Sequence, residues 1–345
     1  MDDQATIRTY GNTALPRQTA ERPLVTFAVF AYNQERYIRE AVEGAFSQTY
    51  SPLEIILSDD CSSDRTFEIM EEMAREYRGP HLVKVRRNIN NLGTLAHLLS
   101  VARIADGIFL VVAAGDDISF TERTETMVQI MLAAPQDVAV ASSDDVIFDD
   151  AGNIYDGKED VLCRRQWFAN QRGWFHGAAA VYRTETLCRL PIPNRRILHE
   201  DTAIILFFNH TDLGSSRIER PLLYRRAHAQ NVGTIRLADA QDSLANERRR
   251  WSNVAMRTEA YDYAAMAIAI LGGDSHKLQH KANFFRQYAK WPEMRLVARA
   301  RLLVVAIRHG YVYGYVKSVL IRFPGRFRFM LVKKLSSIIS RLSRA

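Results

Sequence analysis

Three short apolar segments, each ending in polar residues and followed by a helical pattern, most constrain the fold of this chain. They are residues 24–30, 53–57 and 108–114. Apolar runs of this length, rich in β-branched residues, are typical of buried strands. Strands that alternate with helices usually form one parallel sheet, whose strand ends meet at a common edge. We therefore predict an α/β fold with a mostly parallel sheet flanked by helices, and a ligand crevice at that edge.

Two adjacent carboxylates, Asp116 and Asp117, follow Gly115 at the end of the third strand. Neighbouring acids repel each other and lose hydration there, which is unfavourable unless a cation binds. Mg²⁺ and Mn²⁺ prefer oxygen ligands and often share them with substrate phosphates. The pair predicts a metal–diphosphate site. The alternative is a solvated turn with two surface acids.

A second group of acids follows the second strand, within residues 58–66. Asp59 and Asp60 would lie at the strand end, able to accept hydrogen bonds from a nucleobase or from ribose hydroxyls. Ser63 or Asp64 could cap the helix that follows. The alternative is a capped strand–helix turn of the kind that any α/β protein uses.

Four motifs occur in a fixed order: residues 31–33 (Ala-Tyr-Asn), 58–66, 88–93 and 115–117. In this order and spacing they resemble family 2 of the nucleotide-sugar-dependent glycosyltransferases, which have the Rossmann-like GT-A fold. The resemblance covers roughly residues 22–235, about the size of one large α/β domain.

Two later segments are also similar to that family. Residues 198–204 resemble its Glu-Asp motif, in which an acid activates the acceptor hydroxyl. Residues 224–231 resemble the Arg-x-His-x-x-Asn segment that often closes the catalytic domain.

The resemblance implies a role for individual residues. The donor nucleotide sugar would lie against a set of residues from the first motifs: Ala31, Tyr32, Asn33, Glu35, Asp59, Asp60, Asn91, Gly93 and Asp116. Asp117 would hold Mg²⁺ or Mn²⁺, with His228 able to reach the metal or the diphosphate. Because the acidic motif is Gly-Asp-Asp rather than a spaced Asp-x-Asp, the choice between the two carboxylates stays open.

Asp201 would be the general base, with Glu200 as the alternative. Asp201 precedes the apolar run 204–208, and a carboxylate near an apolar wall can have its pKa raised toward the useful range. The alternative is an acid in the first turn of a helix, favoured by the helix dipole. A single base on the acceptor side implies direct displacement with inversion at the anomeric carbon.

Fewer sequence signals identify the residues that would bind the acceptor. Trp174 and His176 lie beside glycines in residues 171–180 and are candidates for contact with an acceptor sugar. The alternative is a packed loop in which Trp174 is a core anchor. Residues 150–153 predict a hairpin turn rather than a second metal site.

Charge is unevenly distributed along the chain. From residue 295 onward there are twelve Lys or Arg and no Asp or Glu; because the whole chain carries +7, the rest sums to −5. We expect a flexible segment 1–22, a catalytic domain 23–235 and a helical region 236–345 with this basic amphipathic tail. No apolar run in the tail reaches the roughly 18 residues that span a bilayer. The basic amphipathic tail favours peripheral association with an anionic membrane. Packing of the tail on the catalytic domain is the alternative. Nucleic-acid binding is a third interpretation, but no recognised nucleic-acid module supports it.

These observations predict an enzyme that transfers a sugar from a nucleotide-diphosphate donor, UDP by family frequency, to a glycan or lipid-linked glycan. Family resemblance alone places it in cell-surface polysaccharide assembly. Three cysteines without paired spacing fit a reducing cytosol, so we expect it at the inner face of the plasma membrane. A nucleotidyltransferase is one alternative, but no Gly-rich basic loop follows Phe30. A catalytically inactive binding homologue is the other, and it should have lost Asp117 or Asp201.

Overall fold

The computed structural model describes residues 6–11, 18–155, 175–228 and 258–290, with 294, 295, 298, 301, 302 and 305. The chain divides into two compact units, Met1–Gln241 with Tyr263–Ser275, and Asp242–Asp262 with His276–Ala345.

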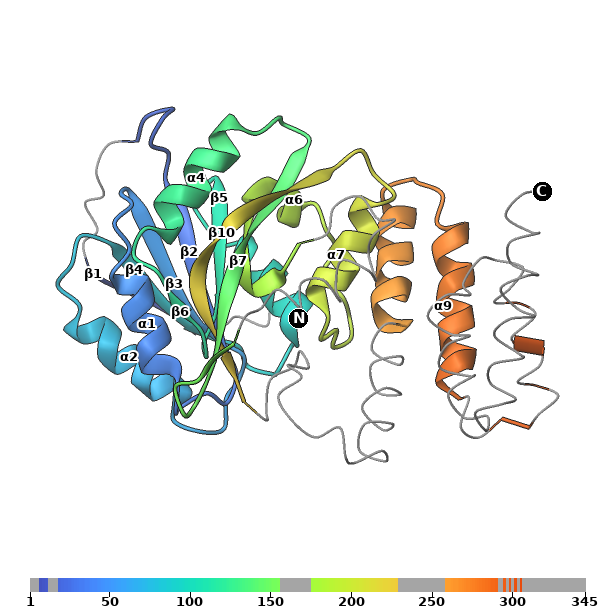
Figure 1. The fold of residues 1–345 in the computed structure, drawn as a ribbon, viewed down its shortest axis with the longest axis horizontal. Helices are drawn as coiled ribbons and strands as arrows, with labels where there is room; N and C mark the ends of the chain where they lie inside the picture. Colours follow the sequence, from blue (N-terminus) through green and yellow to red (C-terminus); the bar gives the residue numbers. More distant parts are fainter. Residues whose placement is uncertain are drawn as a thin grey trace. The chain divides into compact units, whose positions relative to one another are not determined.

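A ten-stranded sheet forms the centre of the first unit (Figure 1). Its order is β1-β4-β3-β2-β5-β9-β7-β10-β6, with β8 beside β7. The strands are β1 (Thr6–Gly11), β2 (Val25–Ala31), β3 (Leu53–Asp59), β4 (Leu82–Arg87), β5 (Phe109–Ala114), β6 (Ile118–Ser119), β7 (Val138–Asp149), β8 (Ile154–Tyr155), β9 (Ala180–Arg183) and β10 (Gly214–Ala227). The helices of this unit include α1 (Ile38–Phe46), α2 (Thr66–Glu76), α3 (Thr94–Ala102), α4 (Arg123–Ala133), the 3₁₀ turn η1 (Gly177–Ala179), α6 (Thr184–Cys188) and α7 (Glu200–Phe208).

The four central strands β4, β3, β2 and β5 run parallel. β9 runs antiparallel between β5 and β7, and β7 pairs with β10 in parallel. The predicted α/β sheet flanked by helices is therefore confirmed. Because β2, β3 and β5 share one direction, the polar residues that follow them lie at the same edge.

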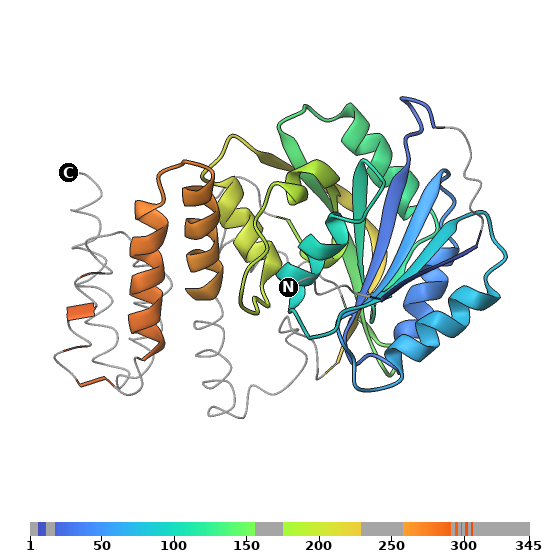
Figure 2. The ribbon, with the colours of Figure 1, turned by 180° about the vertical axis from the view of Figure 1, so that it is seen from behind.

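Alternation along the strands separates two faces of the sheet. Phe27, Val29, Ile55 and Val111 belong to the main hydrophobic core, with residues of α1, α2 and α4. The intervening side chains of these strands point to the other face. Helix α3 lies on that face (Figure 2), where its His97 contacts Phe30 of β2. This second face also carries buried polar side chains such as Ser58, near the ends of the strands.

The first strand differs from the sequence prediction of a flexible segment up to residue 22. Residues 6–11 form β1, which pairs antiparallel with β4 at the edge of the sheet. The ion pair of Arg8 with Glu71 and the hydrogen bond from the Tyr10 hydroxyl to Glu71 at 3.3 Å tie it to α2. The alternating β-branched and aromatic side chains of this short segment are typical of a strand. The overall composition of residues 1–22 obscured that signal.

The predicted hairpin at residues 150–153 is present between β7 and β8. The Asp149 amide donates to the Asn153 carbonyl oxygen at 3.1 Å, and the Gly152 amide donates to the Asp149 carbonyl oxygen at 2.9 Å.

In the second unit, α9 (His276–Ala289) packs on residues 258–262, with Arg286 bonded to Asp262 at 2.7 Å and Tyr261 stacked on Phe285 at 4.9 Å. In the C-terminal region residues 258–270 and 276–289 are helical, while most of the basic tail lies outside the described residues. In the part of the chain that the structure describes, no helix has the length and apolarity to cross a membrane.

Candidate active site

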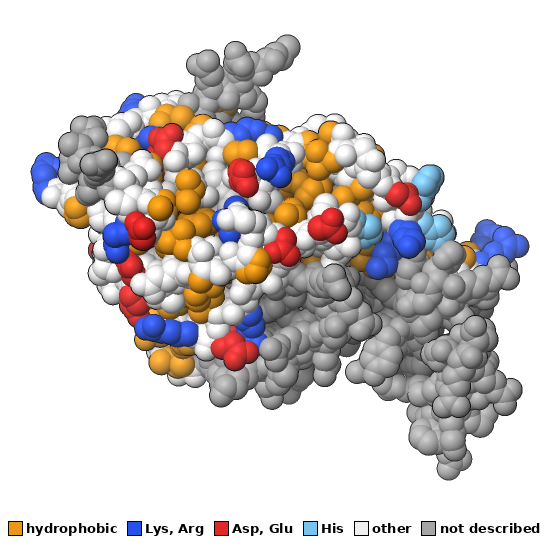
Figure 3. All heavy atoms as spheres, turned by 90° about the horizontal axis from the view of Figure 1, so that it is seen from above, with side chains coloured by type: hydrophobic (Ala, Val, Ile, Leu, Met, Phe, Trp, Pro, Cys, Tyr) orange, Lys and Arg blue, Asp and Glu red, His pale blue; other side chains and the backbone are white. Residues whose placement is uncertain are grey.

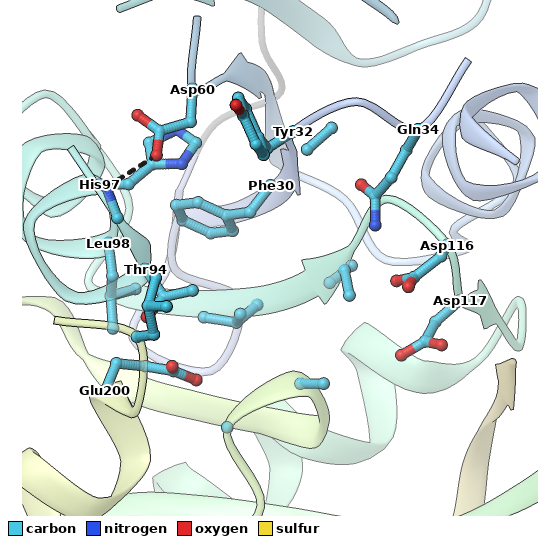
Figure 4. Close-up of a pocket in the computed structure, with 18 of the residues that line it drawn as sticks. Phe30, Tyr32, Gln34, Asp60, Thr94, His97, Leu98, Asp116, Asp117 and Glu200 are labelled. Atoms are coloured by element: carbon cyan, nitrogen blue, oxygen red, sulfur yellow. Dashed lines mark hydrogen bonds between the residues drawn. The ribbon is translucent and has the colours of Figure 1, made fainter. Parts of the chain in front are cut away.

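A cleft of about 490 Å³ opens beside the ends of β2 and β5. Twelve of the residues singled out from the sequence line it: Ala31, Tyr32, Asn33, Asp60, Asn91, Gly93, Asp116, Asp117, His176, Glu200, Asp201 and His228. Figure 4 shows Asp60, the pair Asp116–Asp117 and Glu200 around the same cavity. Trp174 lies outside the described residues.

Two of the predicted donor-site residues, Glu35 and Asp59, do not line the cleft. Glu35 is exposed and accepts a hydrogen bond from the backbone amide of Arg65, at the start of α2, at 3.0 Å. Asp59 is fully buried, accepts from the Ser62 amide at 3.0 Å and pairs with Arg87 at 3.3 Å. Burial raises the pKa of Asp59 despite these bonds. Both acids order the turn between β3 and α2.

Asp60 holds the loop that precedes α3. Its carboxylate accepts from the Asn88 side chain at 2.8 Å, the Leu92 amide at 2.8 Å and the Gly93 amide at 2.9 Å. Gly93 has φ 78°, a left-handed conformation that glycine adopts without strain. Asp60 therefore fixes the 88–93 loop and keeps part of its carboxylate facing the cleft.

A buried polar network lies behind Asp60. His97 of α3 is within 2.5 Å of the Ser58 hydroxyl, and Arg86 donates to that hydroxyl at 3.3 Å and to the Asn88 side chain at 2.5 Å. Burial lowers the pKa of Arg86 to about 10. Burial, with the charge of Arg86, lowers the pKa of His97 well below its usual value, which favours the neutral ring. The sequence analysis did not identify His97 and Arg86. The pattern that could have indicated this network is the alternation of side chains along β3 and β4, which puts Ser58 and Arg86 on the cleft side.

Asp116 and Asp117 are 8% and 3% exposed. The Arg226 amide donates to Asp117 at 2.9 Å, and the His228 ring nitrogen lies 2.8 Å from the Asp116 carboxylate. Tyr37 stacks on the His228 ring at 4.8 Å and fixes its orientation. Burial and the neighbouring charge of Asp116 raise the pKa of Asp117 well above its usual value. A bound cation would offset both penalties.

The donor set fits a divalent ion of the Mg²⁺ class. No group of three His, Cys, Asp or Glu side chains that could form a closed protein cage is present among the described residues. Such an ion is, however, commonly held by one or two carboxylates together with substrate phosphates and water. The buried Oε1 of Gln34 also lines this cleft and has no hydrogen-bond partner among the described residues.

Glu200 and Asp201 begin α7 on the opposite wall. Burial and the charge of Asp201 raise the pKa of Glu200 to about 7. Asp201 accepts from the Thr202 amide at 2.5 Å. Gly177 of η1 lies directly against Glu200, because a Cβ at that position would be 2.3 Å from Glu200 Oε1. Glu200 is thus suited to gain or lose a proton near neutral pH.

His176 is held at the cleft wall by Asp145 of β7, an acid that the sequence analysis did not identify as part of the site. Its Nδ1 lies 3.3 Å from Asp145, which also pairs with Arg225 of β10. Burial opposes ionisation of Asp145, but His176 and Arg225 hold the pKa of Asp145 well below its usual range. Asp145, which lies before the hairpin turn at residues 150–153, thus supports the wall of the cleft.

Residues 26–190 match the family model described as glycosyl transferase family 2. These residues form a family 2 glycosyltransferase domain. The family match spans the motifs after β2, β3 and β5 that build the cleft, which confirms the resemblance seen in the sequence.

Solved structures of glycosyltransferases share the fold, confirming the GT-A prediction. A mannosyltransferase of Pyrobaculum calidifontis, PcManGT, in complex with GDP-Man and Mn²⁺, has a TM-score of 0.51 at 16% identity, over 93% of this chain and 86% of that one. TarS of S. aureus, residues 1–349 in complex with UDP-GlcNAc, has a TM-score of 0.52 at 14% identity, over 83% and 80%.

Curated relatives match the family 2 domain over short stretches. The E. coli protein WfaP, named a UDP-Glc:α-D-GlcNAc-diphosphoundecaprenol β-1,3-glucosyltransferase, is 29% identical over 108 residues, which is 31% of this chain and 41% of WfaP. The chain spans only 25% of the length of the first mycobacterial relatives it matches.

Proposed function

We propose that this protein is an inverting glycosyltransferase, which moves a sugar from a nucleotide-diphosphate donor to a hydroxyl of a glycan or lipid-linked glycan. The observation that carries the proposal is the division of one cleft into three carboxylate positions (Figure 4). Asp60 would receive the nucleoside, Asp116 and Asp117 the diphosphate with its metal, and Glu200 with Asp201 the acceptor hydroxyl. The nucleotide sugars in the PcManGT and TarS complexes support a donor of this class.

The hydrogen bonds of Asp60 favour a uracil base. A carboxylate has about four acceptor positions, and three are used by the 88–93 loop. Uracil presents one ring N–H between two carbonyl groups, which matches the one remaining position. Guanine presents two adjacent N–H donors, and the corresponding ring nitrogens of cytosine and adenine are acceptors that a carboxylate repels.

The chemistry divides between the two walls. Asp117, with Asp116, would hold Mg²⁺ or Mn²⁺, which supplies positive charge to the departing diphosphate. As the acceptor oxygen bonds to the anomeric carbon and the bond to the diphosphate oxygen breaks, Asp201 or Glu200 takes the acceptor proton. Displacement from one side through an oxocarbenium-like transition state gives inversion.

The acceptor is proposed to be carried on a membrane lipid, as the name of WfaP describes for that protein. The basic residues beyond position 295 support peripheral binding to an anionic membrane, which would place the enzyme at the inner face of the plasma membrane in polysaccharide assembly. On the face seen in Figure 3, Lys or Arg and Asp or Glu side chains are interspersed. Sedimentation of the full chain with anionic but not zwitterionic vesicles, abolished by high salt, is expected; equal binding to both refutes the electrostatic attachment.

The donor site is tested by thermal shift with UDP, GDP, CDP and ADP, each with and without Mn²⁺. We expect UDP to stabilise the wild type in a metal-dependent way, by roughly 2.7 kcal/mol at about a hundred times the dissociation constant. Asp117→Asn should lose that stabilisation, whereas Asp137→Asn, a change at an exposed acid outside the cleft, should keep it. A folded wild type that no nucleotide stabilises would refute the donor-site assignment.

Measurements of turnover distinguish a transferase from the two alternatives, an inactive homologue and a nucleotidyltransferase. A transferase releases UDP from its donor only slowly until an acceptor is supplied, and Asp201→Asn or Glu200→Gln lowers that rate while nucleotide binding persists. An inactive homologue binds nucleotide sugar with no turnover of the wild type. A nucleotidyltransferase would release pyrophosphate from a nucleoside triphosphate.

A further inference from the structure

Tyr182 is buried in the middle of the sheet with its hydroxyl group unpaired. Its side chain is fully buried, and its hydroxyl oxygen has no hydrogen-bond partner among the described residues. The residue lies on β9, opposite Leu110 of β5 and Val140 of β7. Buried tyrosine hydroxyls usually find a partner, so an unpaired one requires an explanation.

The hydroxyl lies on the cleft side of the sheet. The neighbouring Val181 belongs to the hydrophobic core on the other face, and successive side chains of a strand point to opposite faces. Tyr182 is accordingly part of the wall of the cleft. Phe175 packs edge-on against its ring, with centroids 5.6 Å apart and planes at 90°, which fixes the ring in place.

The carboxylates of α7 are suitable hydrogen-bond acceptors for the Tyr182 hydroxyl. Burial raises the pKa of Tyr182, and the charges of Glu200 and Asp201 raise it further, so these two acids lie within electrostatic range of the hydroxyl. Glu200 also rests against Gly177, five residues before Tyr182 on the same connection into β9. A phenol that donates to a carboxylate makes a charge-assisted bond, which is stronger than a neutral one.

We propose that Tyr182 is a positioning residue for the acceptor-side base: its hydroxyl donates a hydrogen bond to the Glu200 carboxylate when an acceptor occupies the cleft. The bond orients the Glu200–Asp201 pair toward the acceptor hydroxyl and favours the ionised carboxylate. This role rests on the proposed glycosyl transfer. No covalent step at Tyr182 is involved, because the phenol keeps its proton throughout.

Other buried tyrosines of the same unit show what a purely structural role looks like. The Tyr50 hydroxyl donates to the Pro23 carbonyl oxygen at 2.6 Å, and the Tyr263 hydroxyl donates to the Pro191 carbonyl oxygen at 2.9 Å. Each of these hydroxyl groups joins two segments of the fold. The Tyr182 hydroxyl joins none among the described residues, and a phenyl ring would fill the same space without an unpaired donor.

The test compares Tyr182→Phe with Tyr263→Phe, using the donor that the thermal-shift panel selects. Tyr182→Phe should keep or raise the Tm and keep the nucleotide-dependent shift, because it removes only an unpaired group. Its kcat should fall about tenfold, and the acidic limb of its kcat profile should move up by about one pH unit, as expected for loss of one hydrogen bond to a charged group. Tyr263→Phe should lower the Tm and leave the kcat profile in place.

Other titratable groups line the same cleft, so the shift in the acidic limb of the kcat profile must be assigned to Glu200 by a separate measurement. The acids are Asp60, Asp116, Asp117 and Asp201, and the histidine and arginine side chains are His97, His176, Arg196, His199, Arg225 and His228. In a Glu200→Gln background, Tyr182→Phe should cause no further pH shift, since the bond it removes needs the Glu200 carboxylate.

A Tyr182→Phe protein with wild-type kcat and pH limb would overturn the proposal, as would one whose activity loss parallels a fall in Tm. A shift that persists in Glu200→Gln would also overturn it. Failure of the glycosyltransferase assignment is distinguishable, because it appears in the wild type as absent nucleotide stabilisation or absent turnover.

Discussion

Replacing Gly177 by alanine should displace the Glu200 carboxylate while leaving the fold intact. The added Cβ would lie 2.3 Å from Glu200 Oε1 and 3.5 Å from Asp201 Cβ. Ordinary contact begins at about 3.4 Å, so the carboxylate oxygen must retreat by about 1 Å. Because that oxygen is the end of a flexible side chain at the start of α7, the movement requires little change in the backbone.

A displacement of about 1 Å in a catalytic group can lower a rate by about 10²-fold, which corresponds to about 2.7 kcal/mol of transition-state stabilisation. The assay is release of nucleoside diphosphate in the presence of acceptor, measured beside the Tm of the same preparation. Gly214→Ala is the matched control, since the nearest atom to its Cβ would be the Asp137 carbonyl oxygen at 3.9 Å. Full activity of Gly177→Ala would refute the reasoning, and a large fall in its Tm would show that the clash falls on the backbone instead.

Three further changes test the physical account of the site. The raised pKa of Glu200, about 7 against an ordinary 4.5, means that the folded protein binds this proton more tightly; its stability should fall as pH rises from about 4.5 to about 7. Glu200→Gln should therefore gain Tm relative to the wild type at pH 8 but not at pH 4, and equal differences at both would contradict the assignment. Asp60→Asn leaves at least one loop donor such as the Gly93 amide unpaired, and denaturant unfolding should show a loss of about 1–3 kcal/mol with nucleotide stabilisation abolished. Arg123→Met removes donors from buried acceptors including the Ala178 carbonyl oxygen, so unfolding should show a loss on the order of 3 kcal/mol; an unchanged midpoint would show that these bonds contribute nothing net.

The sequence was sufficient to bring the residues of the proposed donor side together at one cleft, because its signals are local. Apolar runs of strand length, each ending in polar residues, placed Asp60 and Asp117 at one sheet edge, and the structure brings both to the cleft. The same local chemistry could not separate Asp60 from Asp59. Both are carboxylates at the end of β3, but one faces the cleft, whereas the other is buried and bonded to the Ser62 amide. Glu35 illustrates the same limit, since an acid that satisfies a helix N-terminus and an acid that binds a ligand have one sequence signature.

The proposed acceptor side depends on pairings between distant segments, which a sequence pattern does not specify. Asp145 reaches Arg225 only because β7 and β10 pair in parallel, with irregularities in register at Pro221. Tyr182 lines the same cleft as the α7 carboxylates only because β9 inserts antiparallel between β5 and β7. In a strand of four residues, no periodicity could have indicated which face its side chains occupy.

The two halves of the cleft are joined by one buried cation. Arg123 of α4 is 0% exposed, and it donates to the Val112 carbonyl oxygen at 2.5 Å, the Ser119 hydroxyl at 2.8 Å and the Ala178 carbonyl oxygen at 3.0 Å. Val112 lies on the strand that leads to Asp116 and Asp117, whereas Ala178 lies in η1, next to the glycine against which Glu200 rests. Burial lowers the pKa of Arg123 to about 10, which leaves the guanidinium charged at neutral pH. A charge in this position is costly to bury, so its three bonds must be made together. The consequence is that the strand leading to Asp116 and Asp117 and the turn that lies against Glu200 are held at a fixed separation by side-chain bonds, which the proposed in-line transfer between these acids requires.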